Sequence, residues 1–131
     1  VLRHKQKQFE PLGLHVLEPL WDMSSREVIE AYLRSGIRAV TVVVDASVLE
    51  ATDVGMLLDR EFVDRLPAGA DPCGELGEYH TFAYDGPLFT TPVRFELSEL
   101  RRFEREIGTT DGRQRFAYWL ATPRVPDVAR L

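Results

Sequence analysis

The sequence is organised around residues 71–89, which read DPCGELGEYHTFAYDGPLF. Gly74 and Gly77 lie three residues apart, a spacing typical of a turn whose backbone takes positive φ or closely approaches a ligand. The residues that follow, 79–84, are aromatic or β-branched in the main and predict a strand. Asp85 and Gly86 are turn residues, and the proline after them cannot donate to a ladder. The stretch therefore predicts a turn, a strand and a second turn.

Acids, an imidazole and a hydroxyl gather where the first turn meets this strand. In an extended segment Glu78, His80 and Phe82 share one face. The other face carries Tyr79, Thr81 and Ala83. The candidate site residues are Asp71, Cys73, Gly74, Glu75, Gly77, Glu78, Tyr79, His80 and Thr81.

A purely structural interpretation stands beside this one. The run from Gly74 to Glu78 could be a solvated turn, His80 a hydrogen-bonded structural histidine, and Cys73 a small buried hydrophobe. For any one of these residues alone, the structural interpretation is the better one. Only the cluster as a whole points to a site.

Three chemistries are open to the cluster. The three histidines are far apart in the sequence and lack metal-ligand spacing. Cys73 and His80 could form a nucleophilic pair, but nothing in the sequence shows an activated thiol. Carboxylate chemistry fits best, because Glu75 and Glu78 could bind an amine, hold Mg²⁺ through water, or accept a proton from an attacking nitrogen.

The sequence before residue 70 predicts alternating helices and strands. Helices are expected over 1–12, ended by Gly13, over 24–35 with a capping box from Ser24 to Glu27, and over 59–66. A short strand is expected over 14–20. Trp21 follows it, and is interpreted first as a packed core aromatic and second as a ring that could stack on a base. Residues 39–44 are apolar on both faces and predict a central strand continuing a parallel sheet. Asp45 is interpreted first as a helix N-cap.

The sequence after residue 90 is richer in strand patterns. Alternation over 92–97 and 115–120 predicts two antiparallel strands, with a loop over 109–112 between them. The arginines at 101, 102 and 105 are interpreted as a solvated helix face. The tail after Pro123 is expected to be loosely held.

Composition limits the function classes. The chain has 131 residues, enough for one domain with a core, and a net charge of −5, which argues against a nucleic-acid surface. A single cysteine excludes an intrachain disulfide, and no apolar run is long enough to span a bilayer. We therefore expect a cytoplasmic protein with neither nucleic acid nor membrane as a partner.

The signature itself resembles that of the diphthine–ammonia ligase family, the N-type ATP pyrophosphatases also called ATP-binding domain 4 proteins. The similarity rests on DPCGE-x-GEYHTF followed by DGPLF, and covers roughly residues 2–98 through the shorter matches Gly13-Leu14, Pro19-Leu20-Trp21, SGIRAV at 35–40 and Leu66-Pro67. Leu76 stands where the family has a small or amide residue. Met56 stands after Gly55 where an arginine is expected, which removes one phosphate contact.

This resemblance implies an α/β (α+β) fold with a mixed β-sheet flanked by helices, the C-terminal domain of an adenine nucleotide alpha hydrolase-like protein. Residues 1–131 would form a single acceptor domain, because the family's N-terminal PP-loop domain with its Ser-Gly-Gly-x-Asp-Ser motif is not in this sequence. The implied reaction adenylates a carboxylate with ATP and passes the acyl group to ammonia. Its implied catalytic residues are Glu75, Glu78 and His80, and the other candidate residues would bind substrate.

The implied cofactors are ATP and Mg²⁺, held mainly by the N-terminal domain. The implied partners are ATP or AMP, ammonia, and an acceptor carboxylate, which is diphthine on elongation factor 2 in eukaryotes and archaea and unknown in bacteria. A homodimer is left open. Without a Gly-rich phosphate loop, the chain alone is expected neither to hydrolyse ATP nor to bind it tightly. An adenine-nucleotide-binding module and a structural dimerisation domain, both without turnover, remain alternatives.

Overall fold

The N-terminal segment is helical and then irregular in the computed structural model, which describes residues 2–109 and 112–126. Helix α1 (Leu2–Phe9) runs into a 3₁₀ turn, η1 (Glu10–Leu12), and Gly13 ends it at φ 72°. This confirms the first helix. The strand expected over 14–20 is wrong, because consecutive turns at Trp21 and Met23 replace the ladder. An ion pair of 2.7 Å between Lys5 and Glu18 ties this segment back to α1.

Helix α2 (Ser25–Arg34) begins as the sequence predicts. The Ser24 side chain accepts a hydrogen bond from the Glu27 N–H, and the Glu27 carboxylate accepts one from the Ser24 N–H at 2.8 Å. This reciprocal capping box satisfies two of the amides that a helix N-terminus leaves unpaired. The capping box therefore fixes the start of α2 at Ser24.

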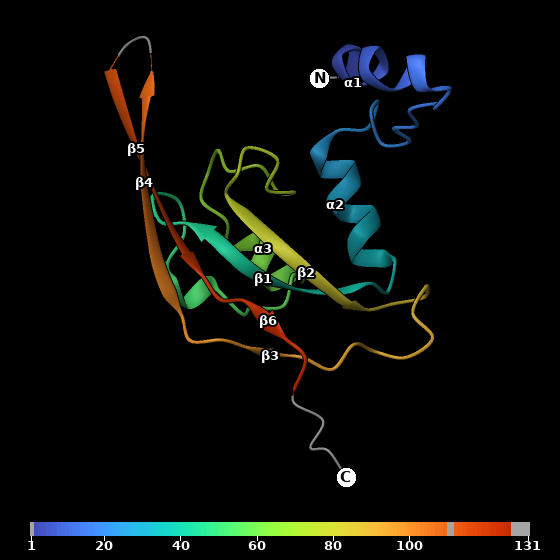
Figure 1. The fold of residues 1–131 in the computed structure, drawn as a ribbon. Coiled ribbons are helices and arrows are strands. Elements are labelled where there is room, and N and C mark those ends of the chain that lie inside the picture. Colours follow the sequence, from blue (N-terminus) through green and yellow to red (C-terminus); the bar gives the residue numbers. More distant parts are fainter. Residues whose placement is uncertain (1, 110–111, 127–131) are drawn as a thin grey trace.

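A four-stranded sheet in the order β2-β1-β5-β4 forms the centre of the molecule (Figure 1). It comprises β1 (Arg38–Asp45), β2 (Tyr79–Asp85), β4 (Arg101–Thr109) and β5 (Gly112–Leu120). The α+β fold class is confirmed, but the expected parallel continuation is wrong. All three strand pairs are antiparallel.

Strand β1 is central and buried, as its apolar pattern predicts. Thr41 and Val44 are fully buried. The pattern indicates burial on both faces, which parallel strands share, but it does not encode strand direction. The segment after η2 (Ala51–Asp53) fills the backbone edge of β1 that β5 leaves open, because the Thr41 N–H donates to the Met56 carbonyl at 2.9 Å and the Gly55 N–H donates to the Thr41 carbonyl at 2.8 Å.

The C-terminal third differs most from expectation. The arginines at 101, 102 and 105 lie on strand β4, so the helix-face interpretation is wrong. The expected strand 92–97 is reduced to β3 (Glu96–Leu97), which pairs with β6 (Pro123–Arg124) and not with β5. Upstream of β3, Phe95 packs on the rings of Phe82 and Tyr84 with centroids 5.1 and 5.2 Å away, so the chain crosses β2 there.

Strand β5 confirms the prediction for 115–120, and the loop expected over 109–112 falls partly outside the described residues. Beyond Arg124, only 125 and 126 are described, and the prediction for the tail lies mostly outside them. Figure 1 shows the β4–β5 hairpin projecting at the opposite side of the molecule from α1 and α2.

The hydrophobic core lies between the sheet, α2 and α3 (Arg60–Asp64). Its buried members are Ile29, Val44, Leu49, Leu58, Phe62, Val63 and Tyr79. Asp59 caps α3 by accepting from the Phe62 N–H at 2.9 Å, which confirms this short helix. Asp45 caps no helix, in contrast to the expectation, because its carboxylate accepts from the Ser47 N–H at 2.8 Å and closes a turn instead.

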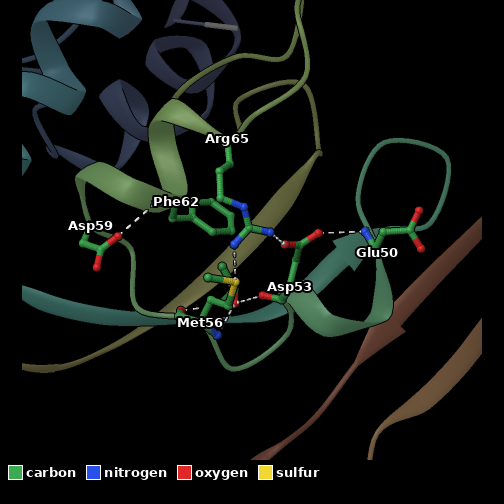
Figure 2. Close-up of polar contacts among 7 residues, drawn as sticks. Glu50, Asp53, Met56, Asp59, Phe62 and Arg65 are labelled. Carbon is green, nitrogen blue, oxygen red and sulfur yellow. Dashed lines mark hydrogen bonds and ion pairs between the residues drawn. The ribbon is translucent and has the colours of Figure 1, made fainter.

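A polar network fixes the segment that lies beside the first half of β1 (Figure 2). The Asp53 carboxylate, 5% exposed as a residue, accepts from the Glu50 N–H at 2.8 Å and from the Arg65 guanidinium at 3.0 Å. The Thr41 hydroxyl donates to the Asp53 carbonyl and accepts from the Met56 N–H at 3.1 Å. Each of these polar groups therefore has a hydrogen-bond partner. These bonds hold the segment from Glu50 to Met56 in place beside β1.

Candidate functional site

The turn between residues 71 and 78 is shaped by a buried glutamate. Glu78 is 5% exposed, and its carboxylate accepts from the Asp71 N–H at 2.8 Å and from the Leu76 N–H at 3.0 Å. Its backbone carbonyl accepts from the Asp45 N–H at 2.9 Å, so the turn is also joined to the end of β1. Glu78, which the sequence put forward together with Glu75 for carboxylate chemistry, therefore has both carboxylate oxygens bonded to backbone amides of its own loop. Its carboxylate holds the loop together.

The two glycines act as the sequence predicts. Gly74 has φ 71° and Gly77 has φ 93°, both in the left-handed region. A Cβ on Gly74 would lie 2.8 Å from the Tyr79 carbonyl oxygen, whereas one on Gly77 would meet nothing within 4 Å. The close backbone approach expected at Gly74 is therefore made to the protein's own strand.

Three other candidate residues anchor the loop to the protein. Asp71 accepts from the Ser25 hydroxyl at 2.6 Å and from the Cys73 N–H at 2.8 Å. The Cys73 thiol donates to the Ser25 carbonyl at 3.2 Å. The Tyr79 hydroxyl donates to the Pro72 carbonyl at 2.5 Å, and its ring packs edge-on against a core phenylalanine. The loop is thus fixed to the first turn of α2 and to the start of β2.

The thiol and the phenol at this anchor are both held in their protonated forms. Burial raises the pKa of Cys73, and the negative charges of Asp71 and Glu75 raise it further. Burial likewise raises the pKa of Tyr79 far above its usual range. A nucleophilic cysteine needs a depressed pKa. The Cys73–His80 nucleophile that the sequence left open is therefore not supported.

The remaining polar residues face open space. Glu75, His80 and Thr81 are exposed and line a cavity of about 510 Å³ between α2 and the start of β2, together with Gly74 and Gly77. Helix α2 contributes Val28, Ile29 and Tyr32 to its wall. The sequence did not single out these helix residues as part of a site, because 3.6-residue periodicity does not tell a cavity wall from a packed face.

A second cavity of about 530 Å³ lies on the other side of the loop and shares Val28, Cys73 and Glu75 with the first. It is also lined by Trp21, which is 53% exposed. The expectation that Trp21 packs in the core is wrong, and its ring is available at this surface. Glu75 therefore stands between two cavities.

The charges around the first cavity restrict what it can bind. Among its lining residues within the described part of the chain, Glu75 is the one carboxylate, His80 is the one imidazole, and there is no lysine or arginine. No group of three or more potential metal ligands occurs among residues 2–109 and 112–126. The cavity suits a neutral or positively charged polar group, and phosphates would find no cationic side chain there.

Within the same described residues, none of the helices combines the length and the apolar character that crossing a bilayer requires.

Comparison with known proteins identifies the family. The family model described as "Diphthamide synthase C-terminal domain" matches residues 20–114. A diphthine–ammonia ligase of Schizosaccharomyces pombe is 36% identical over 102 residues, which are 74% of this chain and 16% of that protein. Diphthine–ammonia ligases of Bos taurus and Homo sapiens are each 32% identical over 94 residues, 68% of this chain and 35% of theirs.

The chain thus spans about a sixth of the fission-yeast relative and about a third of the mammalian ones. The matched residues include the whole of the glycine turn, strand β2 and both cavities apart from Lys5, Glu18 and Pro19. A family model that covers most of a chain, including its candidate site, establishes membership. The chain belongs to the diphthamide synthase C-terminal domain family.

Proposed function

We propose that this chain is the acceptor-side domain of an ATP-dependent amide-forming ligase of the diphthine–ammonia ligase type. Family membership and the similarity to diphthine–ammonia ligases support the class of reaction. In the proposed reaction a substrate carboxylate attacks ATP, giving an acyl-adenylate and pyrophosphate. Ammonia then attacks the acyl carbon, the new C–N bond replaces the bond to AMP, and the nitrogen loses a proton.

The observation that carries the proposal is that most polar side chains of the glycine turn are hydrogen-bonded within the protein, whereas one carboxylate is not. Four side chains form hydrogen bonds that hold the loop in place: Asp71, Cys73, Glu78 and Tyr79. The Glu75 carboxylate, in contrast, makes no hydrogen bond to any described residue and lines both cavities. A carboxylate left free on a rigid loop can bind ammonium or take the proton that the nitrogen loses. We assign that role to Glu75, with His80 and Thr81 as neighbouring polar contacts for the acceptor.

The nucleotide belongs elsewhere in this proposal. The absence of basic side chains from the lining of the first cavity makes it unsuited to a triphosphate. We therefore place ATP and Mg²⁺ on a further part of the polypeptide, with the acyl group reaching the Glu75 cavity. A cytoplasmic location stays a prediction.

The test uses the full-length polypeptide with ATP, Mg²⁺, ammonium and an acceptor protein carrying diphthine. The proposal expects pyrophosphate release that depends on ammonium and on acceptor, together with conversion of the acid to the amide by mass spectrometry. Glu75→Gln should lower turnover by roughly the 10²- to 10⁴-fold typical of a lost acid/base group. Glu61→Gln, a matched change at an exposed glutamate on α3, should leave turnover unchanged.

Two outcomes would overturn the proposal. One is wild-type turnover by Glu75→Gln, which would remove the assignment of the site. The other is tight binding of Mg-ATP by the full-length protein without pyrophosphate release under any acceptor condition. That second result would favour a nucleotide-binding module over an enzyme.

A further inference from the structure

Strand β4 ends the sheet and leaves one backbone edge without a neighbour. In the order β2-β1-β5-β4 it pairs with β5 alone within the described residues. An uncovered edge strand presents a row of N–H and C=O groups that can pair with another chain. At Arg101–Thr109 this edge is nine residues long, and it lies on the hairpin that projects from the rest of the fold (Figure 1).

The hydrogen bonds of β5 show which β4 residues face outward. The Ala121 N–H donates to the Val42 carbonyl, and the Ala117 carbonyl accepts from the Ala46 N–H, so the odd-numbered residues of β5 bond to β1. The even-numbered ones must then bond to β4, where their partners are odd-numbered, as in Phe103 opposite Tyr118. The free N–H and C=O groups of β4 are therefore those at 102, 104, 106 and 108.

The side chains on this strand are of two kinds. On the even-numbered face, Glu104 pairs with Arg102 at 2.9 Å and with Arg115 at 2.6 Å. On the odd-numbered face, Phe103 is 50% exposed. Arg105 forms no ion pair with any described residue. A partner strand would therefore have to cover the exposed Phe103 ring and supply a group that pairs with Arg105.

We propose that β4 pairs antiparallel with β4 of a second copy, joining two sheets into one across a two-fold axis at Glu104. In this register Arg102 of each copy faces Glu106 of the other, and Phe103 of each faces Arg105 of the other. Opposite charges and cation–π contacts therefore occur twice each. The two Glu104 carboxylates meet at the axis, where each already has its own pair of arginines.

Neighbouring registers do not achieve this match. Moving the axis to Phe103 places Arg102 opposite Glu104 twice, but it also places Arg101 opposite Arg105 twice. Moving it to Arg105 places Glu104 opposite Glu106 twice. In a register whose axis lies between two residues, each even-numbered residue would face an odd-numbered one. Free N–H and C=O groups would then face groups that already bond to β5. A self-complementary pattern about one axis is what an isologous dimer requires, whereas a foreign peptide would need no such symmetry.

The experiment measures mass and amide exchange on the full-length polypeptide, independently of any catalysis. Sedimentation velocity over a concentration series should show a monomer–dimer equilibrium that weakens in high salt. Arg102→Glu, which places like charges opposite each other twice, should weaken dimerisation by roughly tenfold or more. The double variant Arg102→Glu/Glu106→Arg restores opposite charges across the axis and should restore the dimer. Arg26→Glu, the same change at an exposed site on α2, should have no effect.

Hydrogen exchange supplies a readout that does not depend on side chains. Amides at 102, 104 and 106 should exchange fast in the monomer and become protected as concentration rises, while those at 103, 105 and 107 should be protected throughout. Circular dichroism confirms that each variant is folded. A protein that stays monomeric at all concentrations, a dimer unaffected by Arg102→Glu, or a dimer whose even-numbered β4 amides stay unprotected would each overturn the proposal. None of these outcomes bears on turnover, so they are distinguishable from a failure of the proposed function.

Discussion

Replacing Glu78 by glutamine should destabilise the protein even though the two side chains have nearly the same shape. The carboxylate accepts two backbone N–H groups, from Asp71 and Leu76. A glutamine has one acceptor oxygen and turns its NH₂ toward the other donor, so one partly buried N–H loses its partner. Such a stranded group costs about 1–3 kcal/mol of unfolding free energy. With an unfolding entropy of about 2.1 cal/mol/K per residue, this lowers Tm by roughly 4–11 °C.

The matched control is Glu75→Gln in the same loop. Glu75 is exposed and makes no hydrogen bond to the described residues, so its replacement should change unfolding free energy by less than about 0.5 kcal/mol. Two measurements separate the two roles: thermal unfolding of this chain followed by circular dichroism, and pyrophosphate release by the full-length polypeptide well below its Tm. Glu78→Gln should lose stability and keep its turnover per folded molecule, and Glu75→Gln should do the reverse. An unchanged Tm with collapsed turnover in Glu78→Gln would refute this reasoning and assign Glu78 to the chemistry.

Two further predictions concern the same loop. Gly74→Ala and Gly77→Ala both place a side chain at positive φ, at about 1–2 kcal/mol each, but Gly74→Ala also forces a Cβ to within 2.8 Å of the Tyr79 carbonyl. Urea unfolding should therefore show a larger loss for Gly74→Ala, and equal losses would contradict the close approach. Burial raises the pKa of Tyr79, so the unfolded state loses this proton first as pH rises, and the stabilisation present below about pH 10 is lost above it at up to about 1.4 kcal/mol per pH unit. Tyr79→Phe should reduce that alkaline slope in urea unfolding, and an unchanged slope would show that another group causes it.

The sequence predicted those parts of the fold whose signals are local. The Ser24 capping box and the left-handed glycines at 74 and 77 depend on neighbouring residues, and all three are found. Strand direction depends on which distant segments meet, and the buried pattern of β1 is compatible with either direction. The parallel sheet was therefore a reasonable but wrong inference.

Strand β4 was missed for a different reason. Both of its faces are exposed, so the alternation of apolar and polar residues that marks a half-buried strand is interrupted by arginines and glutamates at 101, 102 and 104–106. Its partner β5 keeps a more apolar second half because that half lies against β1. An edge strand on a projecting hairpin carries little periodic signal.

The sequence placed the glycine turn along the chain but not the directions of its side chains. Nearness to a glycine turn pointed to both Glu75 and Glu78, yet one carboxylate is exposed and the other is buried on backbone amides. Which of two acids in a turn satisfies the turn's own N–H groups is decided by its three-dimensional path, and the sequence gives no measure of that path. The Asp53–Arg65 pair was missed likewise, because its partners are twelve residues apart.

The double attachment of the loop to Ser25 has a dynamic consequence. Asp71 and Cys73 both bond to this one residue, at its hydroxyl and at its carbonyl, so the floor of the cavity and the first turn of α2 must move as one body. A ligand then binds to a cavity whose walls are already in place, so the cavity residues lose little conformational entropy on binding. Differences in affinity between ligands should accordingly appear in their dissociation rates and hardly at all in their association rates.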